Sequence, residues 1–236
     1  MLLLASLKNV YAGSMRGVRR GLDRCGRDGG PPPLDRRWRH WAYSLTVVHD
    51  SRAMADLDVP WWTYRAIAAV EEWLTARPVP ARVFEYGSGA STVWLARRAG
   101  EVHSVEHDRG FAELMHAELV DHPNASVRVV EALPSTSPVV GSQKEGHKGL
   151  DFAEYVGAID QAPGSFDLVV IDGRAREACL AAASGRIAHD GLIVFDNSRR
   201  RRYREAITRS GLQERVLRGL TPTLPYPEQT SLLTPR

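Results

Sequence analysis

The 236-residue chain is long enough for one α/β domain with a substantial core and an N-terminal extension. Its hydrophobic content of 43% and charged content of 25% are typical of a soluble globular protein, and a net charge of +3 indicates a nucleic-acid partner only if the basic residues cluster. The two cysteines, Cys25 and Cys179, lie far apart in the sequence, which excludes a disulfide framework and favours a reducing, cytoplasmic location.

Residues 1–33 predict a flexible basic tail and linker. The apolar run at 1–7 is too short for a transmembrane helix or for the apolar core of a signal peptide, so no membrane-spanning segment is expected. Arginines follow this run, and Gly-Gly-Pro-Pro-Pro at 29–33 predicts a linker. Two interpretations remain open: the tail is solvated, or it is a basic amphipathic segment that contacts a membrane surface or a partner.

Residues 34–80 predict a helical cover ahead of the sheet. The stretch 34–56 is helical in part, and residues 61–76 place Trp62, Ile67, Val70 and Trp73 at helical spacing. Five of the six tryptophans precede residue 80. Because each tryptophan buries a large apolar area, we expect them to pack against an edge of the sheet; the alternative is that Trp61 and Trp62 wall a substrate pocket.

Residues 81–92 organise the rest of the chain: an apolar strand, a glycine turn, and a helix that begins at Ser91 or Thr92. Such a turn lets a ligand approach the backbone closely, with helix N–H groups directed at it. A dinucleotide site requires a third glycine where Thr92 stands. Glu85 would repel a pyrophosphate but suits a cationic ligand, such as the ammonium or sulfonium group of S-adenosylmethionine. A turn without a ligand is the alternative.

The second predicted strand, 101–106, ends in Glu106 about 20 residues beyond the glycines. At that spacing a carboxylate can accept hydrogen bonds from both hydroxyls of a ribose. His107 follows directly. A helix at 110–119 leads to a third strand at 126–130, and Glu131 at its end would meet an adenine edge or simply be exposed.

Residues 134–149 predict a long polar loop, of the kind that forms a lid or is disordered. A short helix at 151–159 precedes a near-continuously apolar strand at 166–173, a helix at 174–187 and a strand at 191–197. A basic helix at 199–209 and strands at 212–217 and 230–233 complete the chain. Strands that alternate with helices predict an α/β fold with a parallel, doubly wound sheet.

The glycine turn after Glu85, the acidic Glu106, and the strand ends Asp172 and Asp196-Asn197 resemble a class I S-adenosylmethionine-dependent methyltransferase over about residues 60–233. The resemblance implies a Rossmann-like, seven-stranded, mostly parallel sheet with helices on both faces, within a domain at 81–236, and with the last strand antiparallel. It also implies the cofactor-binding residues Glu85, Gly87, Ser88, Gly89, Ser91, Thr92, Glu106, His107, Glu131 and Asp172.

Asp172, Asp196 and Asn197 end neighbouring strands, and three oxygen ligands in one place suit Mg²⁺. The pattern is similar to that of catechol-type and sugar O-methyltransferases, which implies that Asp172 and Asp196 are catalytic through a metal that binds the acceptor hydroxyl. The alternative is that the aspartates cap helices or bind the cofactor without a metal. The lysine base of the catechol-type enzymes is absent, because Ala175 stands at its position. His107, His147 and His189 are the remaining candidates for the base.

Arg199 to Arg202 form the strongest run of charge. Such a run is either a solvated helix face or a site for an acidic acceptor, for example a phosphorylated or carboxylated sugar. The leading hypothesis is O-methylation of a small-molecule or glycan hydroxyl. One alternative is an RNA methyltransferase, although no Asn/Asp-Pro-Pro-Tyr-type motif is present; a non-catalytic interaction protein with this fold is the other. The sequence does not indicate an oligomeric state.

Overall fold

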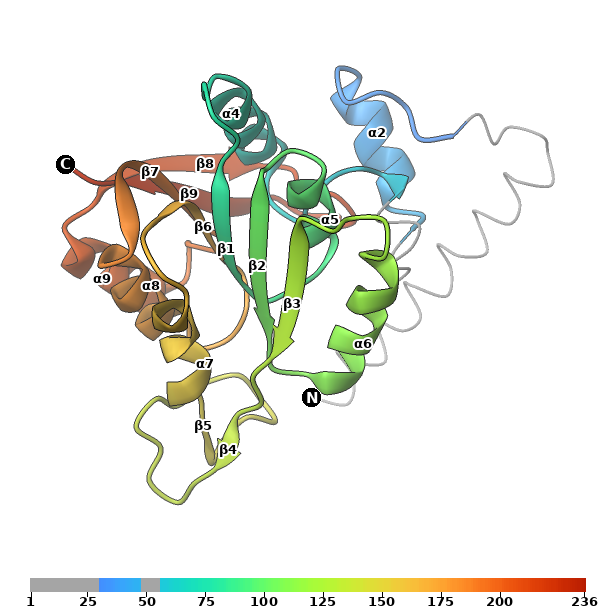
Figure 1. The fold of residues 1–236 in the computed structure, drawn as a ribbon. Helices are drawn as coiled ribbons and strands as arrows, with labels where there is room; N and C mark the ends of the chain where they lie inside the picture. Colours follow the sequence, from blue (N-terminus) through green and yellow to red (C-terminus); the bar gives the residue numbers. More distant parts are fainter. Residues whose placement is uncertain (1–29, 48–55) are drawn as a thin grey trace.

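The computed structural model describes residues 30–47 and 56–236 (Figure 1). Cys25 and the predicted basic tail up to residue 29 lie outside the described residues, so both interpretations of the tail stay predictions. Within the described ranges, no helix is long and apolar enough to cross a membrane.

Seven strands form one sheet in the order β3-β2-β1-β6-β7-β9-β8. Their bounds are β1 (Arg82–Tyr86), β2 (Glu101–Glu106), β3 (Ala125–Val129), β6 (Phe166–Ile171), β7 (Ile187–Phe195), β8 (Gln213–Gly219) and β9 (Glu228–Thr234). All neighbours pair in parallel except β9, which runs antiparallel to both β7 and β8. The predicted α/β class, the seven strands and the antiparallel last strand are therefore confirmed.

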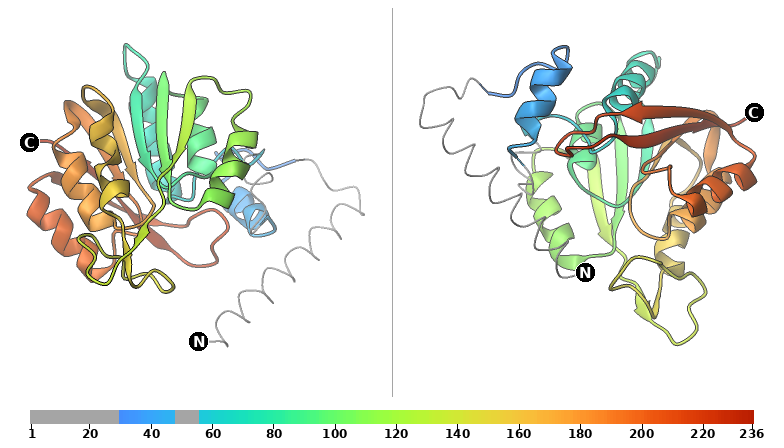
Figure 2. Two further views of the ribbon diagram at one scale, coloured as in Figure 1. Left: turned by 60° about the horizontal axis from the view of Figure 1, so that its bottom comes forward. Right: turned by 180° about the vertical axis from the view of Figure 1, so that it is seen from behind.

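Helices cover both faces of the sheet (Figure 2). Alternate residues of a strand point to opposite faces, so Val83 packs with α4 and α5 while Phe84 packs with α7, α8 and α9. The α-helices are α2 (Arg37–Ser44), α4 (Tyr64–Thr75), α5 (Ala90–Ala96), α6 (Arg109–Glu118), α7 (Ala153–Gly157), α8 (Arg176–Ser184) and α9 (Arg201–Ser210), with a 3₁₀ turn η1 (Ala158–Gln161) after α7. In this doubly wound arrangement the described helices cover the two faces of the sheet, and the ends of the strands lie outside that cover.

The segment predicted as a helical cover shares its core with the sheet. Trp62 is fully buried and meets Trp94 of α5 edge to face, with ring centroids 5.7 Å apart. Trp41 donates a hydrogen bond from its indole N–H to the carbonyl of Leu224, ahead of β9. Asp58 forms ion pairs with Arg97 and Arg98 after α5. These contacts hold the cover against α5 and against the loop between β8 and β9.

The long polar loop is closed at its base by a short antiparallel pair, β4 (Leu133–Pro134) and β5 (Leu150–Asp151). The carboxylate of Asp151 accepts hydrogen bonds from the N–H groups of Val139, Val140 and Ala153, and these bonds lower its pKa. Figure 1 shows the loop beyond the carboxyl ends of β1, β2 and β3, which are the ends that carry the predicted site.

One sequence-based helix boundary was wrong, and one short strand pair was missed. The helix predicted to reach residue 187 ends at Ser184, and Ile187 is already the first residue of β7. The alanine-rich sequence favours continued helix, but Gly185 ends α8 and Ile187 pairs with Phe166 of β6. The pair β4 and β5 was not predicted, because strands of two residues carry no periodic signal.

Candidate functional site

The glycine turn is held against the loop after β6. Gly87 has a φ of 96°, in the region that favours glycine, and a Cβ placed there would lie 2.6 Å from the Cα of Gly173. A Cβ on Gly173 would in turn lie 2.0 Å from the hydroxyl oxygen of Tyr155 in α7. The two glycines therefore pack backbone to backbone, and the turns after β1 and β6 form a single unit.

Glu85, at the end of β1, is fully buried and holds the start of α5. Its Oε1 accepts a hydrogen bond from the Ser91 hydroxyl and its Oε2 one from the Thr92 hydroxyl, both at 2.5 Å. Thr92 Oγ1 also accepts the N–H of Gly89 at 2.9 Å. The residue that stands where a dinucleotide site has glycine thus ties the turn to the strand. The predicted contact of these residues with the cofactor stays a prediction.

Burial raises the pKa of Glu85 to about 7, against an ordinary value of 4.5, while the Ser91 and Thr92 hydroxyls act in the opposite direction. Between these two values the folded protein keeps a proton that the unfolded chain releases, so the contribution of Glu85 to stability falls as the pH rises. The total loss is about 3 kcal/mol.

We expect Glu85→Gln to flatten this part of the stability profile, because the neutral amide cannot ionise. The free energy of unfolding in urea, followed between about pH 5 and pH 8, should fall more steeply for the wild type than for the variant. Parallel profiles for the two proteins would show that Glu85 is not the group responsible.

Glu106 ends β2 beside the same turn, with only 4% of the residue exposed. Its Oε2 accepts the N–H of Ser88 at 3.1 Å, and its Oε1 accepts the N–H groups of His107 and Asp108 at 2.8 and 2.9 Å. Burial alone would raise the pKa of Glu106, but the bonds from His107 and Asp108 outweigh it and lower the pKa. The carboxylate is therefore ionised and directed at the glycine turn.

Gly89 supplies room for a ligand at this place. Its backbone is extended, with φ at 168°, and a Cβ placed on it would meet no atom within 4 Å. Open space above a glycine, next to an ionised carboxylate at the neighbouring strand end, fits a nucleoside whose ribose hydroxyls donate to Glu106. These residues fit the cofactor that the sequence pattern implies.

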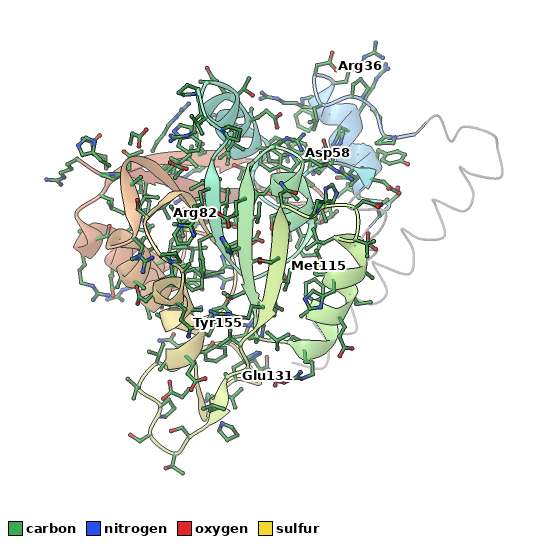
Figure 3. The ribbon with its side chains drawn as sticks, in the orientation of Figure 1. Arg36, Asp58, Arg82, Met115, Glu131 and Tyr155 are labelled. Atoms are coloured by element: carbon green, nitrogen blue, oxygen red, sulfur yellow. The ribbon has the colours of Figure 1, made fainter. Side chains whose placement is uncertain are left out.

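The other predicted cofactor residues lie at the same end of the sheet. Figure 3 shows Glu131 and Tyr155 there, with Asp58 towards the opposite end. The Glu131 side chain is half exposed and pairs with Arg109 at 2.6 Å. His107 lies with its Nδ1 2.5 Å from Glu106 Oε1, and its Nε2 is 3.4 Å from Nε2 of His147. Because His147 belongs to the long loop, that loop borders Glu106.

Asp172 and Asp196 end β6 and β7 as predicted, but an arginine connects them. The guanidinium of Arg176 donates to Asp172 Oδ1 at 2.6 Å, to the Asp196 carbonyl at 2.7 Å and to the Gly173 carbonyl at 3.0 Å. It also lies 3.4 Å from Asn197 Oδ1. Asp196 is 3% exposed and accepts the hydroxyl of Thr230 at 2.7 Å. Burial raises the pKa of both aspartates, and Arg176 opposes that rise in each.

This arrangement does not fit the predicted magnesium site. One carboxylate oxygen of Asp172, Oδ1, and the side-chain oxygen of Asn197 already face the cationic guanidinium of Arg176, and Asp196 is bonded to Thr230. Among residues 30–47 and 56–236, no group of three or more His, Cys, Asp or Glu side chains is arranged to hold a metal ion. Arg176 supplies the positive charge at the position where Mg²⁺ was expected.

The histidines considered as bases occupy different places. His107 and His147 lie beside Glu106, and His189 is exposed near the start of β7, away from the carboxyl ends of the strands. The sequence did not reveal which arginine after Asp172 points inward. That depends on Ala175, which has a left-handed φ of 48° immediately before α8 and turns Arg176 into the core. A left-handed alanine has no sequence signal.

A cavity of about 250 Å³ opens beside this arginine. It lies between residues 141–144 of the long loop, the first turn of α8 and the first turn of α9. Gly173, which packs against Gly87 of the glycine turn, also lines the cavity. The cavity therefore borders the packed turns after β1 and β6.

No family model matches the chain, and no curated protein matches it. Solved structures do. A precorrin-6y C5,15-methyltransferase from Geobacter metallireducens has a TM-score of 0.50 at 14% identity, covering 72% of this chain and 88% of that one. An rRNA methylase from Streptococcus thermophilus has a TM-score of 0.50 at 10% identity, covering 71% and 95%.

A methyltransferase-like protein from Silicibacter pomeroyi is 27% identical, with a TM-score of 0.46 and coverage of 71% of this chain and 86% of that one. Together with the strand order, the likenesses at a TM-score of 0.50 show the fold. The protein has the Rossmann-like fold of the class I S-adenosylmethionine-dependent methyltransferases.

Proposed function

We propose that the protein is an S-adenosylmethionine-dependent methyltransferase that methylates a hydroxyl group of a small molecule or sugar. The observation that carries the proposal is the pairing of an ionised Glu106 with open space above Gly89, at adjacent strand ends of this fold. The glycine-turn backbone would border the methionine part, Glu106 would accept the ribose hydroxyls, and Glu131 would lie near the adenine.

When bound, S-adenosylmethionine supplies a methyl group on a positively charged sulfur that a hydroxyl oxygen can attack. We assign Asp172 as the base that takes the hydroxyl proton. Its Oδ1 is held by Arg176, while its Oδ2 has no hydrogen bond to any part of the chain that the structure describes. Burial raises the pKa of this carboxyl, against the opposing effect of Arg176, which makes it a better proton acceptor than an exposed aspartate.

Asp196 serves in this proposal as a positioning residue. Its carboxylate is bonded to Thr230 inside the sheet, and its backbone carbonyl holds Arg176, which in turn orients Asp172. Mg²⁺ has no part in the proposal, because Arg176 faces the oxygen atoms that were expected to bind the metal. A screen of labelled methyl transfer to sugar and phenolic acceptors, run with a chelator present throughout, identifies the acceptor class.

The proposal is tested first by Glu106→Gln. Loss of one charge-assisted hydrogen-bond acceptor should weaken S-adenosylmethionine binding about tenfold or more in isothermal titration calorimetry. Glu101→Gln is the matched control, since Glu101 is at the other end of β2 and pairs with Arg82 at the surface. Equal affinity in the wild type and the Glu106 variant would contradict the assigned ribose contact.

An RNA substrate is the second candidate, because the exposed Arg199 to Arg201 precede and open α9 at the same edge. Phosphate contacts by these arginines would give RNA affinity a steep salt dependence. The small volume of the neighbouring cavity favours a compact acceptor over a nucleic-acid strand.

A further inference from the structure

The cavity beside α8 and α9 is unusually basic. Five basic side chains line it, and Glu177 is the one acidic side chain among its lining residues; the basic residues are Lys144, Arg174, Arg176, Arg200 and Arg202. Cations crowded into a space of about 250 Å³ repel one another, so the cavity favours an anion over an apolar ligand. Charge of one sign in a concave site also concentrates oppositely charged ligands.

Two of these cations are neutralised by the protein itself. Arg176 pairs with Asp172 at 2.6 Å, and Arg202 lies 3.3 Å from Glu177. Arg174 and Arg200 form no ion pair with any described residue, and the Nε of Arg174 is buried without a hydrogen-bond partner there. A buried guanidinium N–H without an acceptor is costly. The cavity therefore holds at least two cationic side chains that form no ion pair with a described residue, although both lie close enough to Asp172 to lower its pKa.

Backbone groups add to this positive potential. The first turns of α8 and α9 both line the cavity, and neither helix has a side-chain hydrogen bond at its N-cap, where Ala175 and Arg200 stand. The first N–H groups of a helix need acceptors and carry a partial positive charge. Tyr203 forms the base for the side chains, because the guanidinium groups of Arg200 and Arg202 lie 5.7 and 4.7 Å from its ring centroid.

We propose that this cavity binds a phosphate ester group of the methyl acceptor. Its donors come from three directions, namely the long loop and the starts of two helices, which suits a tetrahedral dianion with several acceptor oxygens. A carboxylate is planar, and one arginine fork satisfies it. The naming of the phosphate as part of the acceptor rests on the proposed methyltransferase function, whereas the anion site stands on the cavity alone.

The position of the cavity would let a bound phosphate group orient the methyl acceptor. Gly173 lines the cavity and packs against Gly87, the first glycine of the turn that would border the methionine part of the cofactor. Asp172 directly precedes Gly173 and is bonded to the cavity-lining Arg176. A phosphate held by Arg174 and Arg200 would fix the acceptor so that a hydroxyl elsewhere on it reaches Asp172. Such positioning is a recognised source of rate enhancement.

The test uses inorganic phosphate as the probe, titrated into the full chain by calorimetry at low salt. Arg174→Gln and Arg200→Ala, made separately, should each weaken phosphate binding about tenfold or more. Arg209→Ala is the matched control, because Arg209 is exposed at the far end of α9 and should leave phosphate affinity unchanged. Thermal unfolding of each variant shows that it is folded, and Arg200, being exposed, is the less disruptive of the two sites.

Further arms separate the ligand classes and the two proposals. Malonate tests a carboxylate, glucose 6-phosphate a phosphate ester, and a short RNA oligonucleotide a nucleic-acid backbone. Binding of phosphate and the ester that both arginine variants weaken is the expected result. No phosphate binding, equal binding in all variants, tighter malonate binding, or binding of RNA without binding of the ester would each overturn the inference. Phosphate binding without S-adenosylmethionine binding would overturn only the proposed function. S-adenosylmethionine binding without phosphate binding would overturn only the phosphate site.

Discussion

Replacement of Arg176 by methionine should destabilise the protein by about 3–5 kcal/mol near neutral pH. Arg176 is 7% exposed, and its guanidinium satisfies Asp172 and the carbonyls that follow β6 and β7. Methionine fills a similar volume but leaves the carboxyl groups of Asp172 and Asp196 close together without the guanidinium that lies between them and contributes most to offsetting their charge. The pKa of each is already raised by burial, and loss of the arginine would raise both further.

The loss should depend on pH in a defined direction. An aspartate whose pKa is higher in the folded state keeps a proton that the unfolded chain has released, so stability falls as the pH rises through the folded-state value. The difference between Arg176→Met and the wild type, measured by urea unfolding, should therefore be smaller at about pH 5 than at about pH 8.

Arg201→Met is the control for the arginine at position 176. The Arg201 side chain is 94% exposed and pairs with Glu205 on the surface of α9, so its loss should change the free energy of unfolding by about 0.5 kcal/mol or less. A pH-independent loss at Arg176, or an equal loss at both positions, would show that the buried carboxylates do not depend on this arginine.

Gly87→Ala should be the most damaging change in the glycine turn, with a loss of about 3 kcal/mol or more. The left-handed φ of 96° disfavours any side chain, and the added Cβ would lie 2.6 Å from the Cα of Gly173 and 2.7 Å from its N atom. Backbone atoms cannot move aside as a flexible side chain can, so the turns after β1 and β6 must separate. Chemical denaturation of the purified variant measures the loss.

Gly89→Ala, two residues away, should behave in the opposite way. Its backbone is extended and its Cβ meets nothing within 4 Å, so stability should change by about 1 kcal/mol or less. The methyl group would instead occupy the space assigned to S-adenosylmethionine and weaken its binding about tenfold or more. Wild-type affinity in a folded Gly89→Ala variant would show that S-adenosylmethionine does not occupy that space. A Gly87→Ala variant as stable as the wild type would contradict the close packing of the two turns.

The central strands could be predicted from the sequence because the information is local, whereas the antiparallel last strand was expected only from the family resemblance. Runs such as 166–171 are apolar on both faces, because helices cover both sides of the sheet. The acidic residues Glu85, Glu106 and Asp172 mark the carboxyl ends of three strands. The boundary between α8 and β7 could not be predicted in the same way. Alanines at 181–183 favour helix, and only the pairing of Ile187 with Phe166 decides for strand.

The sequence predicts where the candidate site lies, but not which of its side chains bond to one another. The sequence places Asp172, Asp196 and Asn197 at neighbouring strand ends, as the structure does, and three oxygen donors there suggested a metal. Which cation meets them depends on the backbone at Ala175, whose left-handed conformation sends Arg176 inward and leaves Arg174 at the cavity. Likewise, the Glu85 carboxyl group accepts hydrogen bonds from the neutral hydroxyls of Ser91 and Thr92. These contacts form because α5 begins at Ala90, which the sequence alone did not indicate.

The insertion of β9 between β7 and β8 has a consequence for biosynthesis. β9 is translated after every other strand that the structure describes, yet it supplies Thr230 to Asp196 and Gln229 to Ser198, at the carboxyl end of β7. During synthesis on the ribosome, a nascent chain that stops short of residue 228 holds a buried aspartate without its hydroxyl partner and a sheet with a gap. Completion of this part of the sheet is therefore late relative to the other described strands, however early the strands around the glycine turn assemble.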